Sequence, residues 1–349
     1  MTWRDLPGDL RALGTRTAVM TAVVLTVTGS VALVVMAADV LLLIFAGVLF
    51  ALLLNSVADP VARTSGLGHG LALALTVVTL MAVAGATGWA LWPSMSDQAD
   101  QLARDLPAAV REVRGWFEQR EWGRWLLGRA GPDQLPDGAA LVSRATGALV
   151  TTVSALGAFL IMLVVGLYVA AQPALYHRGL RRLVPVTGRK RLDEVLLAVT
   201  TVLRWWLLGK MVSMALVGVL TTLGLWWLDV PLALTFGLVA AALTFIPNFG
   251  PVISVVPPAI MALADEPTRA LYVGGLYLGI QVVESYAVTP LIQRRTVSMP
   301  PALTITSQIV LGLLVGGIGV AVATPLTAAA MTVVRMIYVE DLLEDEASA

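Results

Sequence analysis

The sequence predicts an all-α integral membrane protein with about six full transmembrane helices and two broken, re-entrant helical hairpins. Three observations lead to this fold class. Hydrophobic residues make up 58% of the chain and charged residues only 13%, which excludes an ordinary soluble domain. Stretches long enough and apolar enough to cross a bilayer recur along the chain. Two further uncharged stretches, 230–264 and 296–334, are interrupted near their middle by proline or glycine.

We expect four regions along the chain. They are 1–92, transmembrane helices 1–3; 93–147, an extracytoplasmic amphipathic helical segment; 148–204, transmembrane helix 4 and a basic cytoplasmic loop; and 205–349, a transport core of two helix-plus-hairpin units with an acidic tail. The six candidate spans are 18–38, 40–58, 70–92, 145–171, 206–228 and 270–290.

The first two candidate spans form a helical hairpin in this prediction. Arginines precede an apolar run that ends at Ala38, a pattern that resembles a signal peptide. The apolar run resumes at Val40, so we expect a turn at Asp39 rather than cleavage.

The distribution of arginine sets the expected orientation. Arg4, Arg11 and Arg16 precede the first span, and the loop 172–204 is strongly basic. Because basic loops stay in the cytoplasm, we expect a multi-pass protein of the bacterial cytoplasmic membrane with a cytoplasmic N-terminus. Segment 93–147 then lies outside.

The outer segment carries one amphipathic helix. Its apolar side chains recur at spacings of four and three: Leu102, Leu106, Val110, Val113 and Phe117. Gly131-Pro132 and Pro136-Asp137-Gly138 end the helix before the fourth span. Three roles are open for its apolar face: a cap over the pore mouth, packing on a neighbouring subunit, or contact with lipid headgroups.

The two interrupted stretches are too long for one crossing, at 35 and 39 residues against the roughly 20 that a spanning helix needs. Elbows at Pro247–Pro251 and Gly316–Gly319 divide them into half-depth arms. Broken helices are tolerated in lipid where protein packs them or where they line a cavity. In transporters, a pair of such segments marks the transport site.

The two stretches resemble an internal repeat of opposite orientation. Laying Pro231–Thr235 on Pro300–Thr304 at an offset of 69 brings Gly250 onto Gly319. Shared membrane composition is the alternative explanation. Residues 319–338 are also long enough for a full crossing, which would place the acidic tail outside.

Several motifs together resemble one transporter family. They are Thr244–Pro251 followed by Val256-Pro257-Pro258, Gly316–Ala321 with Pro325-Leu326, Leu53-Leu54-Asn55 with Asp59-Pro60, Tyr168–Gln172 with Arg181–Pro185, and Gln281 with Glu284 and Pro290. This set resembles the autoinducer-2 exporter family, the PerM-type permeases, over nearly the whole chain. The resemblance implies transport and a homo-oligomer. Asn248 and Lys210 depart from the family pattern, which puts the solute in doubt.

Two candidate ionisable residues lie at membrane depth. Glu284 is either an ion or proton site or a structural carboxylate paired with Arg294, and Gln281 lies one turn earlier on the same helical face. Lys210 either extends its ammonium group to the membrane interface or pairs with Glu284.

The elbows are the candidate solute contacts: Pro247, Asn248, Gly250 and Pro251 in the first elbow, Gly317 and Gly319 in the second. We expect a positive φ at Gly250 and carbonyl groups left unpaired by the break, which suit a cation or a polar solute. A packing hinge without a ligand is the alternative.

These observations and the family resemblance together favour a secondary transporter or facilitator that works in a lipid bilayer. The resemblance implies that it exports a small polar solute similar to autoinducer-2. The alternatives are a sodium/proton antiporter that uses Glu284 and a non-transporting membrane scaffold. The chain has no cysteine, and His69 and His177 stand outside any H-E-x-x-H motif. We expect no enzyme activity, cofactor, metal site or nucleic-acid partner.

Overall fold

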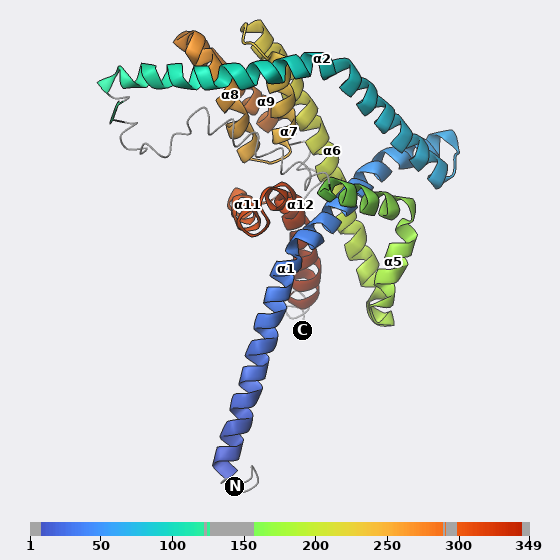
Figure 1. Cartoon of the computed structure of the whole chain (residues 1–349). Helices are drawn as coiled ribbons and strands as arrows, with labels where there is room; N and C mark the ends of the chain where they lie inside the picture. The colour runs from blue at the N-terminus through green and yellow to red at the C-terminus, as the bar shows by residue number, and fades with distance from the viewer. Residues whose placement is uncertain (1–7, 122–123, 126–156, 289, 291–298, 344–349) are drawn as a thin grey trace.

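The computed structural model describes residues 8–121, 124–125, 157–288, 290 and 299–343, and no strand occurs among them (Figure 1). The principal helices are α1 (Gly8–Ser65), α2 (His69–Glu118), the helix Gly157–Ala171, α5 (Pro173–Arg182), α6 (Arg189–Trp227), α7 (Ala233–Thr244), α8 (Phe249–Asp265), α9 (Pro267–Val283), α11 (Pro301–Val315) and α12 (Gly317–Val334). A 3-10 turn, η2 (Val186–Gly188), precedes α6, and two π-helical segments, η3 (Glu284–Val288) and η4 (Arg335–Leu343), extend α9 and α12.

The all-α membrane fold is confirmed. Four described segments are long and apolar enough to cross a membrane: Ala37–Ser65, His69–Trp89, Val186–Trp227 and Gly317–Asp341. The helix Gly157–Ala171 and α5 meet at 85° and make a fifth if they are counted as one broken span. Many large apolar side chains are exposed on these helices, as expected of surfaces that face lipid.

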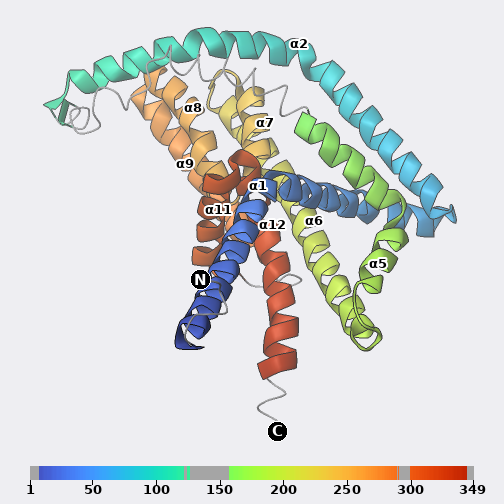
Figure 2. The same cartoon turned by 60° about the horizontal axis from the view of Figure 1, so that its bottom comes forward.

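The predicted turn at Asp39 is wrong, because α1 runs through it as one helix of 58 residues. The sequence around it, Ala37-Ala38-Asp39-Val40, contains no glycine, proline or asparagine to support a tight turn. A single aspartate costs too little helix propensity to end the helix. At 1.5 Å per residue, α1 is about 87 Å long. Its two halves run in different directions in both views (Figures 1 and 2).

Helix α2 is also continuous, across the expected boundary between 92 and 93, with Pro93 and Pro107 inside it. Its second half arches over α8 and α9 (Figure 2), and it packs on α7 and α8. Ala109 is buried there, and three predicted apolar-face residues are partly buried: Val110, Val113 and Phe117. The amphipathic helix therefore covers its own chain. The breaks expected at 131–138 lie outside the described residues.

Helix α6 is the central element. It begins at Arg189, inside the segment expected to be a cytoplasmic loop, and contacts α1, α7, α9 and α12. A buried stripe runs along it at helical spacing: Leu203, Leu207, Lys210, Val217, Thr221 and Leu225. Near its C-terminal end, Leu225 joins Phe236, Val273 and Tyr277 in a core formed with α7, α8 and α9.

Both interrupted stretches are broken as expected. The first folds as α7 and α8, which pack on each other, and the second as α11 and α12, which do the same. The α7–α8 hairpin lies near the arch of α2, whereas the α11–α12 hairpin lies nearer the start of α1 (Figure 2).

One end of the molecule gathers basic side chains, and we call it the basic end: α5, η2 and the start of α6, with Arg181, Arg189 and Arg191. The guanidinium group of Arg191 binds Glu194, Glu340 and Asp341 at 3.0, 3.3 and 2.7 Å. These contacts hold the end of η4 beside the start of α6. The acidic tail therefore begins at the basic end rather than at the end that α2 covers.

Candidate functional site

The two hairpins meet through one glutamine. The side chain of Gln308, in α11, is fully buried at 0% exposure. Its Nε2 donates to the carbonyl oxygen of Pro247 at 3.1 Å and to Oγ1 of Thr324, in α12, at 3.3 Å. The amide therefore links the first elbow to both arms of the second hairpin.

Asn248, rather than Gly250, takes the positive φ at the first elbow, with φ 68° and ψ −45°. These angles lie outside the left-handed helical region and are close to those of a classic γ-turn centred on Asn248, which is a rare and strained turn. The N–H of Gly250 donates to the carbonyl of Ile246 at 3.0 Å, and that of Phe249 to Pro247 at 2.8 Å. Some of the carbonyl groups at the elbow that were expected to be unpaired therefore already accept hydrogen bonds from backbone N–H groups.

Gly250 is required for a different reason, which Gly319 shares. A Cβ atom at Gly250 would lie 2.0 Å from the carbonyl oxygen of Leu243, and one at Gly319 would lie 2.1 Å from that of Leu311. In each hairpin, the first turn of the second arm therefore presses against the backbone of the first arm. The positive φ of the second elbow falls on Gly316, at 73°, while Gly317 is exposed with open space around it.

Lys210 and Glu284 form a buried pair. Each residue is 8% exposed, and Nζ of Lys210 lies 3.9 Å from Oε1 of Glu284. The expectation that Lys210 reaches the membrane interface is wrong, because its neighbour on η3 supplies an opposite charge inside the protein. Nε2 of Gln281 donates to the other oxygen of Glu284 at 3.5 Å. Arg294, the other expected partner, lies outside the described residues.

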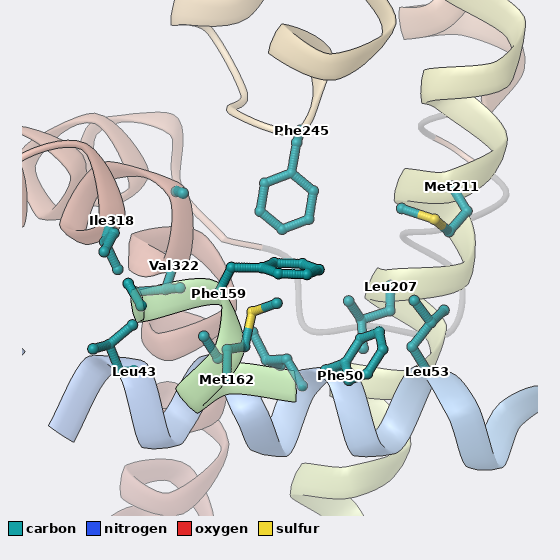
Figure 3. A pocket seen from close by; sticks show the side chains of 14 residues that line it. Leu43, Phe50, Leu53, Phe159, Met162, Leu207, Met211, Phe245, Ile318 and Val322 are labelled. Atoms are coloured by element: carbon teal, nitrogen blue, oxygen red, sulfur yellow. The ribbon is translucent and has the colours of Figure 1, made fainter. Parts of the chain in front are cut away.

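An apolar cavity of about 380 Å³ lies beside both elbows (Figure 3). Phe245, which follows α7 two residues before the first elbow, projects into it, and Ile318 borders it from the second elbow. Its other walls are α1, the helix Gly157–Ala171 and α6, which contribute Phe50, Phe159, Met162 and Leu207 among others. Phe245 also packs edge-on against Trp206, with ring centroids 5.7 Å apart. The cavity wall offers almost no polar surface, and the residues of the Gln308 junction are not among those that line it.

Comparison with known proteins decides the family to which the chain belongs. The model of the AI-2E family transporters matches residues 19–338. The chain belongs to the AI-2E transporter family. It is a multi-pass membrane transporter, and nothing in this similarity points to an enzyme.

The names of the curated relatives of this AI-2E transporter agree with a transport function. It is 25% identical over 273 residues to YrrI of Bacillus subtilis (strain 168), covering 75% of this chain and 77% of the relative. It is 24% identical over 311 residues to YhhT of Escherichia coli (strain K12), covering 84% and 83%. Both are named as candidate transport proteins. A shorter match, 36% identical over 101 residues and 29% of each chain, joins it to the AI-2 transport protein TqsA of the same E. coli strain.

The sequence-based reasoning missed Gln308 and Thr324. Gln308 carries the only carboxamide in the uncharged stretch 296–334 of this AI-2E transporter, which is the signal that would have found it. A lone carboxamide among apolar residues needs a partner when it is buried, so its position predicts a contact with another polar backbone or side chain. No group of three or more histidine, cysteine or acidic residues that could hold a metal occurs among the described residues.

Proposed function

We propose that this AI-2E transporter is a secondary transporter or facilitator that exports a small polar solute along a path between its two hairpins. The observation that carries the proposal is the junction at Gln308, where two broken helices meet through a buried amide. Broken segments that meet inside a bundle form the solute site in many secondary transporters. The similarity to TqsA supports autoinducer-2, or a solute like it, as the cargo.

The proposed orientation places the basic end in the cytoplasm of a bacterial inner membrane. Positive charge near the spans favours this side, and the basic end carries Arg181, Arg189 and Arg191. The N-terminus is then cytoplasmic, and the arch of α2 covers the outer mouth. The α7–α8 hairpin enters from outside and the α11–α12 hairpin from inside, as an inverted pair.

Counterflow tests the transport proposal. Purified protein in proteoliposomes preloaded with unlabelled autoinducer-2 should accumulate labelled autoinducer-2 transiently, because an alternating carrier exchanges one molecule for another. A non-transporting scaffold gives the same trace as empty liposomes.

The buried Lys210–Glu284 pair favours sodium/proton antiport as the second candidate function. Ionisable groups at membrane depth commonly mark ion or proton pathways. A pH-sensitive dye inside the same proteoliposomes distinguishes the two candidates. Antiport predicts an internal pH change when sodium is added outside without solute, whereas solute export alone predicts none.

We also propose a homo-oligomer. The N-terminal half of α1 extends away from the rest of the chain (Figure 1), and Val24 and Leu25 on it are 61% and 67% exposed. A second copy would bury this apolar surface against protein rather than lipid. Mass measurement of the protein in nanodiscs tests the proposal, and a monomer mass would contradict it.

A further inference from the structure

The carboxamide of Gln308 is only half satisfied. Its Nε2 has two acceptors, Pro247 and Thr324, but no described residue donates to its Oε1, which has no exposed surface. Leaving a buried polar atom without a partner costs about 1–3 kcal/mol. Native structures keep few such atoms, and a buried water or a ligand commonly satisfies them.

The orientation of the amide follows from its partner. The oxygen of Pro247 is a backbone carbonyl, which can only accept a hydrogen bond, so the NH2 group of Gln308 must face it. Turning the amide over would bring two acceptors together. The free Oε1 is therefore held pointing away from Pro247, and only a hydrogen-bond donor can satisfy it.

We propose that Oε1 of Gln308 is the acceptor that recognises a hydroxyl group of a neutral transported solute. This inference rests on the transport function proposed above and assigns it a recognition group. A hydroxyl fits better than a charged ammonium, because Gln308, Pro247 and Thr324 carry no charge to offset a desolvated cation. The apolar cavity beside the elbows suits the carbon skeleton of the same solute.

The two ends of the amide then have different tasks. The Nε2 end joins the hairpins, and the Oε1 end binds the solute. A site built to accept a hydroxyl discriminates strongly against an analogue that lacks it, because the acceptor is then left unpaired. This separation allows each end of the carboxamide to be tested alone.

The test compares two variants of the full-length protein in nanodiscs. Gln308→Met keeps roughly the length of the side chain and removes the acceptor, while Pro247 retains the donor of Phe249. Thr324→Val is the matched control, since it removes a partner of Nε2 and leaves Oε1 in place. The readouts are the rise in Tm that autoinducer-2 produces, which gives an apparent Kd, and counterflow of the same solute.

We expect the apparent Kd to increase about tenfold or more in Gln308→Met and to stay within about twofold in Thr324→Val. An analogue of autoinducer-2 that lacks one hydroxyl should show the same loss with the wild-type protein, and no further loss with Gln308→Met. If Gln308→Met does not fold, the comparison of the two solutes on the wild-type protein decides the question alone.

Three results would overturn the inference. One is a Kd for Gln308→Met equal to that of the wild type, which would mean that Oε1 binds a buried water. Another is equal binding of every analogue with one hydroxyl removed, and the third is no rise in Tm of the wild type with autoinducer-2. Binding that depends on Gln308 but is unaccompanied by counterflow would support the inference while contradicting the proposed transport function.

Discussion

Gly250 and Gly319 carry out the same steric task in the two hairpins, and this equivalence does not depend on a positive φ at either residue. The carbonyl oxygens of Leu243 and Leu311 occupy the space that a side chain would need. Because these obstacles are backbone atoms, a larger residue must separate the arms rather than move a side chain.

We therefore expect Gly250→Val and Gly319→Val to lose transport while they still insert into the membrane. Overpacking of this kind typically costs about 1–3 kcal/mol, and separating the arms disturbs the elbow that Gln308 contacts. Gly274→Ala is the control, because an added Cβ there would meet no atom within 4 Å apart from its chain neighbours and the nearby backbone of its own helix. Full counterflow in both valine variants would reduce the elbows to passive hinges.

Single and double variants of the Lys210–Glu284 pair distinguish a structural role from an ion site. A structural pair predicts that Glu284→Gln or Lys210→Met alone lowers stability by about 3–5 kcal/mol, because each leaves a buried charge without its partner. The double variant should then recover part of the loss. An ion or proton site predicts instead that Glu284→Gln folds normally and loses the sodium or pH dependence of flux. Thermal unfolding checks the first prediction, and flux measured across pH checks the second. If neither stability nor the ion dependence of flux changes, Glu284 is not part of the site.

Local sequence spacing predicted the contact between Gln281 and Glu284, because residues three apart share a helical face. The pairing of Lys210 with Glu284 was one of two alternatives, and only the packing of α6 against η3 decides between them. Gln308 was missed because its partners, Pro247 and Thr324, come from another hairpin and another arm. A single sequence does not show which residues of two such distant segments lie opposite each other.

Helices α1 and α2 show where prediction of secondary structure elements fails in membrane proteins. Both broken stretches were predicted, because glycine and proline mark their elbows. The turn at Asp39 and the boundary at 92/93 were inferred from hydropathy and bilayer thickness, and neither interrupts the helix. A change from apolar to amphipathic composition alters which surface a helix faces, but it does not by itself break backbone hydrogen bonds.

Gln98 fastens the outer half of α2 to the start of α7. Its Oε1 accepts hydrogen bonds from the backbone N–H and from Oγ1 of Thr235, at 3.3 and 2.7 Å. The N-cap residue of α7, Leu232, makes no side-chain hydrogen bond to the first turn of that helix.

Gln98→Ala should therefore speed hydrogen exchange at the first turn of α7 and lower stability by about 1 kcal/mol, the usual effect of losing a helix cap. Gln101→Ala, at an exposed position on α2, is the control. Hydrogen exchange measured by mass spectrometry makes the comparison. Equal protection of Thr235 in both variants would mean that α2 rests on α7 without holding it.

At the basic end of the whole molecule, the ion cluster of Arg191 joins η4 to the start of α6. The hydrogen bonds that the guanidinium of Arg191 donates to Asp341 and Glu194 raise the pKa of that group above the usual value. A cation whose folded-state pKa is raised contributes stability at every pH below its unfolded value, and that contribution is lost only as the pH rises through the folded value. The contact should thus persist from about pH 7 to about pH 10.

Arg191→Gln should release the segment 335–343 and make it more sensitive to protease, and high salt should weaken the wild-type contact in the same direction. Arg189→Gln is the control, because within the described part of the chain Arg189 donates to the carbonyl of Val184, at 3.3 Å, and to no acidic side chain. Protease sensitivity that rises when the wild type is moved from about pH 7 to about pH 10 would contradict the assignment to Arg191.

Sided labelling of two introduced cysteines tests most directly whether the two hairpins open on opposite faces of the membrane. The chain has no cysteine, so Asp265→Cys, at the end of α8, and Ala302→Cys, at the start of α11, each give one reactive site. The side chain of Asp265 is 61% exposed, and Ala302 is exposed as well. In intact cells, a membrane-impermeant maleimide should label position 265 and should label position 302 only after the membrane is opened. Labelling of both positions from the same side would contradict the inverted pair and the solute path proposed between its elbows.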